Sequence, residues 1–178
     1  MAKLMKDPAF AREYAKLQLL DDLREGDIVL VRARWWLRWC SQYEHGALLH
    51  WRRHATGLDW YTLEAGGTGV RDWRYGHWPR PWDVFTVRCE DEVAQAAVTA
   101  AMTWRGDPYA WWHLPALFRR TMQPQEVRAA EGRICTELVV DAYREVGVDL
   151  TPGIEYPTPD DIARSELVVK VGGTQEGK

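Results

Sequence analysis

Short hydrophobic runs alternate with turn residues through the first half of the chain, a pattern typical of β-strands. The runs cover residues 28–31, 45–51, 60–64, 68–72 and 83–88, and Gly, Pro or Asp residues stand between them. Strands at this spacing predict an antiparallel meander. Before the first run, Asp7-Pro8 combines an N-cap residue with a proline at the first helical position, which predicts a helix within residues 1–22.

The second half of the chain changes to the helical period. We expect helices over 91–104, over 109–120 with Pro115 as a kink, and over 133–146, followed by a turn at 160–165 and a last strand at 167–171. The first helix would bury Val93, Ala96, Ala97, Ala100 and Trp104, and the third Leu138, Val139, Ala142, Tyr143 and Val146. The pattern predicts one α+β domain over 23–171, an antiparallel meander or partial barrel packed against helices, with a disordered tail over 172–178.

Composition narrows the class of protein. The 178 residues suit one domain, and the net charge of -3 gives no overall basic footprint for nucleic acid. The apolar runs fall far short of the roughly 20 residues of a membrane span, so we expect no stable membrane insertion. The first 20 residues lack the apolar core of a signal peptide, which predicts synthesis in the cytoplasm.

Trp and Arg are concentrated in one region. Eight of the 11 Trp lie between Trp35 and Trp82, and residues 32–88 hold nine Arg against five acidic residues. One interpretation is a Trp-rich core covered by Arg stems; the other is an aromatic and cationic surface for an anionic or sugar-like ligand. We expect most of the eight to fill the core, and two or three to stay exposed beside the functional site.

The three cysteines point to a thiol rather than to disulfides. Their number is odd and their spacing irregular, so a disulfide framework is not expected. Cys135 falls in the first turn of the strongest predicted helix, in register with its inward stripe, where free N–H groups and the helix dipole stabilise a thiolate. Cys40 and Cys89 have no such setting. The competing interpretation is that Cys135 is a small buried hydrophobe.

A nucleophilic cysteine needs a base, and His45 is the best placed of five histidines. It opens a predicted strand just before the small pair Gly46-Ala47, which allows another element to approach closely. Glu64 ends the neighbouring strand and is a candidate to orient the imidazole. The other four are His50, His54, His77 and His113. A metal site at 45, 50 and 54 is disfavoured, because positions 45 and 50 point to opposite faces of a strand.

Five short motifs occur in one order: LREGDIVLV at 23–31, YEHGAL at 43–48, LEA at 63–65 with GVR at 69–71, GDPY at 106–109, and CTELV at 135–139. In this order they resemble the circularly permuted, YiiX-like branch of the NlpC-type papain-like cysteine hydrolases. The related lecithin–retinol acyltransferase-like enzymes share the His-before-Cys order. Thr136 stands where Ser is commoner. Residues 34–43 and 60–82 depart from the family pattern, and we expect both segments to border the site.

The resemblance implies a permuted papain-like fold with Cys135 as nucleophile, His45 as base and Glu64 as the orienting residue. It implies a thiol-dependent amidase or peptidase, or an acyltransferase, acting on a cell-wall peptide or a lipid amide or ester, with no metal or organic cofactor. We expect Tyr43, Tyr109 and Trp39 to contact substrate. A peptidoglycan target would require delivery by phage, lysis or a secretion machine. The alternative is a non-catalytic binding module of the same fold that uses its Trp/Arg surface.

Overall fold

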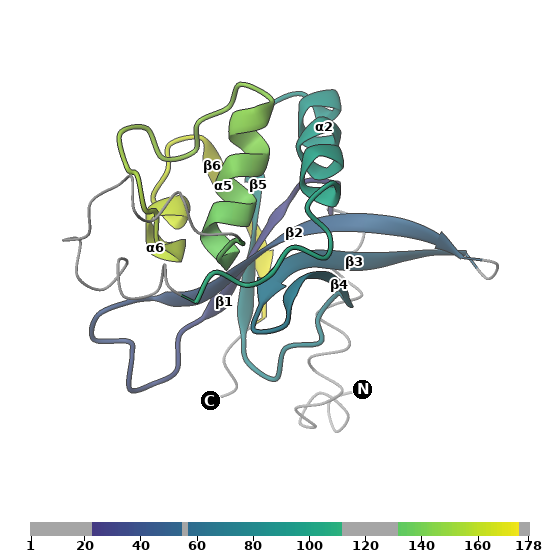
Figure 1. The fold of residues 1–178 in the computed structure, drawn as a ribbon. Coiled ribbons are helices and arrows are strands. Elements are labelled where there is room, and N and C mark those ends of the chain that lie inside the picture. The colour runs from purple at the N-terminus through teal and green to yellow at the C-terminus, as the bar shows by residue number, and fades with distance from the viewer. Residues whose placement is uncertain (1–22, 55–56, 112–131, 175–178) are drawn as a thin grey trace.

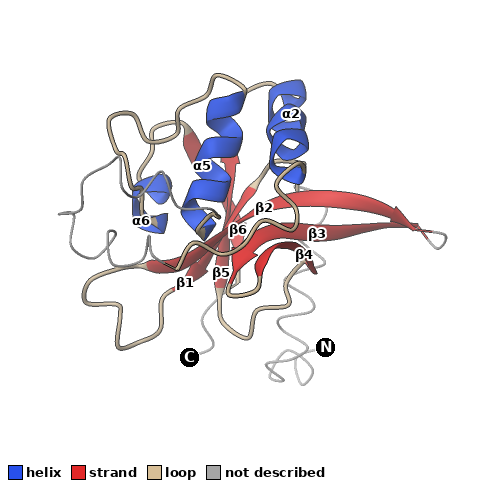
Figure 2. Ribbon diagram, viewed as in Figure 1, coloured by secondary structure: helices blue, strands red, loops and turns tan. Residues whose placement is uncertain are grey.

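The computed structural model describes residues 23–54, 57–111 and 132–174, and there a six-stranded antiparallel sheet carries helices over one face (Figures 1 and 2). This arrangement confirms the predicted α+β class. The strands are β1 (Ile28–Arg32), β2 (Tyr43–His54), β3 (Gly57–Gly66), β4 (Gly69–Arg74), β5 (Trp82–Val87) and β6 (Val168–Gly173). The helices are α2 (Asp91–Met102), α5 (Cys135–Glu145) and α6 (Pro159–Ala163).

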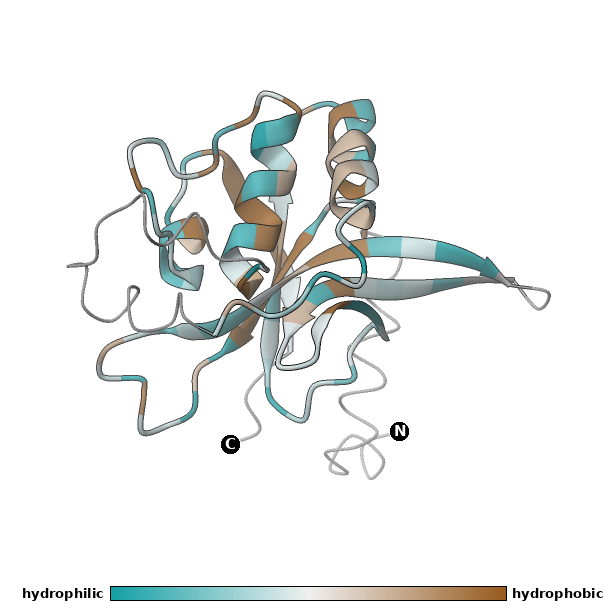
Figure 3. Cartoon of the chain, in the orientation of Figure 1, coloured by the Kyte–Doolittle hydropathy of each residue, from teal (hydrophilic) through white to brown (hydrophobic). Residues whose placement is uncertain are grey.

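The sheet has the order β4-β3-β2-β1-β5-β6. The first four strands form the predicted meander, and β5 returns to pair with the free edge of β1. The β2–β3 hairpin is longer than its hydrophobic run: pairing continues from Leu48↔Leu63 out to His54↔Gly57, and Figure 1 shows it projecting well beyond the helices. The outer part of that hairpin is hydrophilic (Figure 3), which is why hydropathy alone predicted a shorter strand.

Strand β1 is buried on both faces, which explains its unbroken apolar sequence. Ile28 and Leu30 join the helix-side core with Leu138 and Val139 of α5. Figure 3 shows hydrophobic residues gathered where α5 crosses the strands. The alternate residues of β1 pack on the opposite face with Tyr75, Trp78 and Trp82 from the connection between β4 and β5 and the start of β5. This connection therefore supplies the second layer beneath the sheet.

The turn before β1 fixes both long helices against the sheet. Gly26 has a φ of +90°, a conformation that favours glycine, and an added Cβ would collide with Ala94 of α2 and with the Tyr143 hydroxyl. That hydroxyl, from α5, donates to the Gly26 carbonyl at 2.6 Å. The glycine of the GDIVL motif is thus required by the close approach of two helices.

The structure corrects three details of the prediction. Helix α2 buries Ala94, Ala97, Val98 and Ala101 rather than the stripe one residue earlier, because alanines fill both stripes and hydropathy does not separate them. Residues 109–111 are not helical; Tyr109 instead forms a parallel bridge with Arg133. The expected tail begins too early, since Gly172 and Gly173 belong to β6 and Thr174 is buried. The predicted N-terminal helix, the rest of 109–120, and residues 175–178 lie outside the described residues.

Replacing Tyr143 with Phe tests the anchoring of α5 to the turn before β1. The change removes a buried donor from the Gly26 carbonyl, and we expect it to lower the free energy of unfolding by about 1–2 kcal/mol. Urea denaturation measures this as a lower midpoint with an unchanged m-value. An unchanged midpoint would mean that the hydrogen bond contributes nothing to the position of the helix.

Candidate active site

Cys135 is the first residue of α5, and the preceding backbone is held by the GDPY segment. The Arg133 N–H donates to the Pro108 carbonyl at 3.1 Å, and the Ala110 N–H donates to the Arg133 carbonyl at 3.2 Å. Gly132, with a φ of +110°, lies so close to the Pro108 carbonyl that any side chain would clash. The entry into the helix, and therefore the position of the thiol, is fixed by this pairing of two distant segments.

Backbone N–H groups from two elements, β2 and the first turn of α5, reach the cysteine sulfur. The Glu137 carboxylate accepts from the Ile134 N–H at 3.1 Å, so an acidic residue complements the positive end of the helix dipole. The N–H groups of Gly46 and Thr136 hydrogen-bond to the Cys135 sulfur. Gly46 lies where β2 meets α5, and a Cβ there would stand 3.8 Å from the Val139 side chain. The small residue at position 46 lets α5 pack closely on β2, so that the Gly46 N–H reaches the sulfur.

The structure brings together the three residues expected to form the catalytic group. His45 of β2 forms hydrogen bonds with the side chains of both Cys135 and Glu64. Its Nε2 lies 2.8 Å from Glu64 Oε2, which leaves Nδ1 as the ring nitrogen for the thiol. The other Glu64 oxygen accepts from the Thr62 hydroxyl at 2.6 Å. Thr62 and Glu64 are two apart on β3, so they point to the same face and the threonine holds the carboxylate.

The electrostatics of this group favour an ion pair. Burial lowers the pKa of His45, but the hydrogen bonds to Cys135 and Glu64 and the charges of both outweigh it and raise the pKa to about 10. Burial raises the pKa of Cys135, but the hydrogen bond to His45, its positive charge and the two backbone N–H groups lower it below the ordinary thiol value. Between the two pKa values the site holds a thiolate beside an imidazolium.

A second histidine, His77, also faces Glu64. Its Nδ1 lies 3.7 Å from Glu64 Oε1 and 3.2 Å from the Arg74 carbonyl. Its ring stacks on Trp73, with centroids 4.9 Å apart, and lies 4.6 Å from the ring of Trp78. The sequence offered His77 only as one of several histidines in loops. It gave no spacing that would bring the connection between β4 and β5 to the carboxylate.

The three residues expected to contact substrate lie in different surroundings. Tyr109 lies near the thiol: burial raises its pKa, and so do the negative charges of Cys135 and Glu137. Tyr43 is buried, with its hydroxyl donating to Asp83 at 2.7 Å, and it lines a cavity of about 180 Å³ beside α6. Trp39 stands exposed in the loop between β1 and β2. Of the three, Tyr109 is the one whose placement connects it to Cys135.

The other cysteines and histidines have settings of their own. Cys40 is exposed in the loop between β1 and β2, and Cys89 is half-buried after β5. His50 is buried and pairs with Asp72 at 2.9 Å, so it is engaged away from His45. The His54 side chain and His113 lie outside the described residues. Among the side chains that the structure describes, no group of three or more His, Cys, Asp and Glu residues is placed to hold a metal ion.

The tryptophans are more exposed than expected. Of the eight between 35 and 82, only Trp78 and Trp82 are buried, so the expectation that most of them fill the core is wrong. The reason is topological: Trp35, Trp36 and Trp39 share one loop outside the sheet, a position that composition does not reveal. Trp73 and Trp78 meet the site through His77, which agrees with the expectation that residues 60–82 border it.

Comparison with protein-family models and with curated proteins gives no match for this chain. No helix within 23–54, 57–111 and 132–174 has the length and apolar character needed to cross a membrane. Since neither comparison gives a match, the functional assignment depends on the geometry of the site.

Thiol alkylation tests the ion pair directly. The rate at which iodoacetamide alkylates Cys135 should increase with pH as the thiol ionises. Because the pKa of Cys135 is lowered, the midpoint of this increase should lie below the ordinary thiol pKa of about 8.5. In His45→Ala the thiol keeps its burial and loses its partner, so the midpoint should move above that value. The rate at pH 7 should then fall by at least about tenfold.

Peptide mass spectrometry follows each cysteine separately in the same sample. Cys40, which is exposed, supplies the internal reference and should react equally in both proteins. If Cys135 alkylates at the same rate with and without His45, the thiolate–imidazolium pair does not exist.

Proposed function

We propose that the protein is a thiol-dependent hydrolase of the amidase or peptidase kind, or an acyltransferase, that works through an acyl-enzyme on Cys135. The observation that carries the proposal is that one imidazole, His45, contacts a helix-terminal cysteine on one side and a buried carboxylate on the other. A nucleophile, a base and an orienting acid in contact are the arrangement that acyl transfer by a thiol requires.

In the acylation step the Cys135 thiolate attacks the substrate carbonyl carbon, and the carbonyl oxygen takes the negative charge. Backbone N–H groups at the start of α5 supply donors for this oxygen. The His45 imidazolium then gives its proton to the leaving amine or alcohol, and the carbon–heteroatom bond breaks as the carbonyl re-forms. The products of this half-reaction are a thioester on Cys135, a neutral imidazole and the released leaving group.

In the deacylation step the neutral His45 takes a proton from water, or from an acceptor amine or alcohol, as that group attacks the thioester. The sulfur leaves as a thiolate and the imidazolium is restored, so the ion pair is regenerated. Glu64 keeps Nε2 protonated in both steps and offsets the positive charge of the ring whenever the imidazolium is present. His77 adds a second polar group beside the same carboxylate.

The proposal extends to the fold and to the substrate class. The order of base, acid and nucleophile along the chain, on a sheet with α5 packed against it, supports the permuted papain-like arrangement. Beside the site, the Arg71 guanidinium lies 4.6 Å over the ring of Trp73. An apolar face with a cation suits a substrate that combines apolar surface with a carboxylate, as cell-wall peptides and acidic lipid amides do.

Trapping the acyl-enzyme tests the proposed activity. Incubation with an activated acyl ester such as p-nitrophenyl butyrate, followed by an acid quench, should add one acyl mass to the peptide that contains Cys135. Cys135→Ala should show no adduct and no turnover. Cys40→Ser and Cys89→Ser are matched controls that should keep the adduct and the turnover, because the Cys40 thiol donates to the Leu37 carbonyl and the Cys89 thiol lies beside Arg24. A wild-type protein that forms no adduct and turns over no acyl ester, amide or peptide supports the binding module instead.

Glu64→Gln tests the orienting role. Cys135 and Glu64 both raise the pKa of His45, and the amide removes the negative charge of Glu64, so the descending limb of the pH–rate profile should move from about pH 10 to lower pH. Turnover should fall by roughly 10- to 100-fold, which is less than for Cys135→Ala, since Glu64 makes no bond to substrate.

Asp72→Asn is the matched control, because it changes the acid of the other buried His–acid pair. It should leave the descending limb in place. A limb that stays near pH 10 in Glu64→Gln would assign the raised pKa of His45 to another group.

A further inference from the structure

The loop between β1 and β2, residues 33–42, displays three tryptophans to solvent. The exposed fractions are 83% for Trp35, 49% for Trp36 and 86% for Trp39. Trp is highly buried on average in proteins, so three exposed tryptophans on one loop are unusual and point to a binding surface. Figure 1 shows this loop as a protrusion from the sheet at the end where α5 begins.

The loop is built to hold this shape. The Leu37 N–H donates to the Arg34 carbonyl at 2.8 Å, and the N–H groups of Cys40 and Ser41 both donate to the Leu37 carbonyl at 3.0 Å. At its base the Ala33 N–H donates to the Gln42 carbonyl at 2.8 Å. The tryptophans are therefore presented by a hydrogen-bonded turn.

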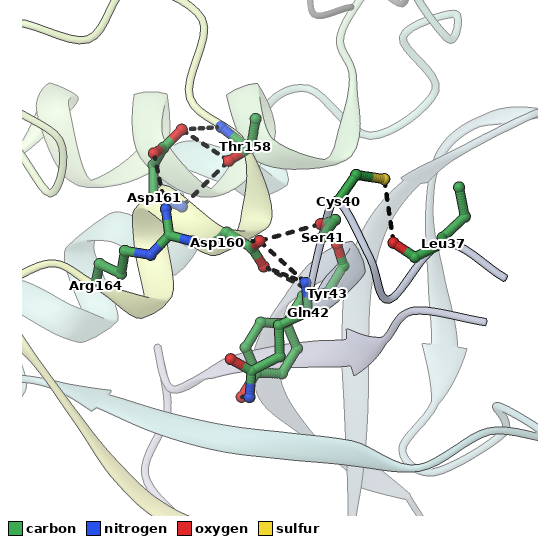
Figure 4. A network of polar contacts seen from close by, with 9 residues as sticks. All are labelled: Leu37, Cys40, Ser41, Gln42, Tyr43, Thr158, Asp160, Asp161 and Arg164. Atoms are coloured by element: carbon green, nitrogen blue, oxygen red, sulfur yellow. Dashed lines mark hydrogen bonds and ion pairs between the residues drawn. The ribbon is translucent and has the colours of Figure 1, made fainter. Parts of the chain in front are cut away.

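A buried carboxylate clamps the base of the loop to α6 (Figure 4). Asp160 accepts from the N–H groups of Gln42 and Tyr43, at 3.0 and 2.9 Å, and from the Ser41 hydroxyl at 3.2 Å. Thr158 caps α6 by accepting from the Asp161 N–H, which keeps Asp160 in position. The base of the loop is consequently attached to the body of the protein. A ligand or surface bound by the tryptophans is therefore held at a fixed place relative to Cys135.

The charge of the loop is positive. Arg34 and Arg38 are its only charged residues, and the Arg34 guanidinium lies 6.0 Å from the ring of Trp36. At the foot of the loop, Glu44 is paired with Arg34 and with Arg80 of the neighbouring connection. Counting the buried Asp160 carboxylate at its base, three arginines stand against two carboxylates at this end of a chain whose net charge is -3.

From these observations we propose that the 33–42 loop binds the surface of an anionic phospholipid bilayer. Trp prefers the interface between headgroups and acyl chains, where its ring is in an apolar layer and its N–H reaches polar groups. Arg beside it is attracted to anionic headgroups. A protruding turn suits a broad flat partner, whereas a sugar or peptide ligand is held in a concave site. The inference goes beyond the proposed activity and does not depend on Cys135.

Vesicle co-sedimentation of the full chain tests the proposal. We expect binding to vesicles of phosphatidylcholine with phosphatidylglycerol, and weaker binding to phosphatidylcholine alone. Trp35→Ser with Trp39→Ser should weaken binding to the anionic vesicles by at least about tenfold. Trp51→Ser, which changes an exposed tryptophan at the far part of β2, is the matched control and should bind as the wild type does.

Two further measurements identify the contact. Vesicles with brominated acyl chains should quench tryptophan fluorescence in the wild type and much less in the double variant. Arg34→Gln with Arg38→Gln should remove the preference for anionic vesicles. The thermal unfolding midpoint should be unchanged in all variants that alter exposed tryptophans, which shows that a loss of binding is not a loss of fold.

Several results overturn the proposal. The proposal is wrong if the wild type does not sediment with either kind of vesicle, or if the double tryptophan variant sediments as well as the wild type. It is also wrong if the protein does not bind vesicles and the tryptophans are instead needed for retention on insoluble peptidoglycan, or for formation of a dimer measured by analytical ultracentrifugation. Because no assay here uses Cys135, the binding results and the acyl-enzyme results succeed or fail independently.

Discussion

The start of helix α5 is the constraint on which the candidate site depends. Its position is set by a pairing between two segments far apart in the chain. The Arg133 backbone is hydrogen-bonded to the backbone of residues 108–110, and Gly132 lies so close to the Pro108 carbonyl that a side chain there would clash. From the other end, the Tyr143 hydroxyl holds the helix to the turn before β1. Because both ends of α5 are fixed, its first N–H groups and the Cys135 thiol lie next to Gly46 and His45 of β2.

In the described part of the chain, His45 and His50 each lie within 2.9 Å of a carboxylate, and the difference between these two pairs shows what makes a site. His50 and Asp72 form one pair. Arg105 also lies 2.8 Å from the Asp72 carboxylate, so His50 shares this acid with a cation, and none of the three cysteines is its partner. His45 and Glu64 form the other pair, and there the ring lies next to Cys135. A histidine beside a carboxylate contributes to packing in the first case, and in the second it holds an imidazolium beside a thiolate. The third partner decides the chemistry.

Much of this structure can be predicted from the sequence, because strand β1 and the stripe of α5 bury enough apolar surface to fix their own periods. Cys135, His45 and Glu64 stood out as candidates because each lies at the end of a patterned element, but their roles as nucleophile, base and orienting residue were predicted from the resemblance carried by the five ordered motifs. His77 and the exposed tryptophans were missed because they lie in connections, where side-chain direction follows from the tertiary path. The burial of Tyr43 likewise depends on Asp83 in a strand that is not its neighbour in the chain. The alanine-rich helix α2 was placed one residue out of phase, because Ala contributes too little to hydropathy to fix a face.

Asp160 has a consequence for the order in which the protein is made. Its carboxylate completes the base of the 33–42 loop, yet it is translated 117 residues after Tyr43. During synthesis the loop therefore emerges with its tryptophans exposed and without the clamp that shapes it, and it waits for the C-terminal third of the chain. Contacts of such long sequence separation close late in folding. Ribosome-bound chains that end before α6 therefore carry this loop without the carboxylate that holds residues 41–43 in place.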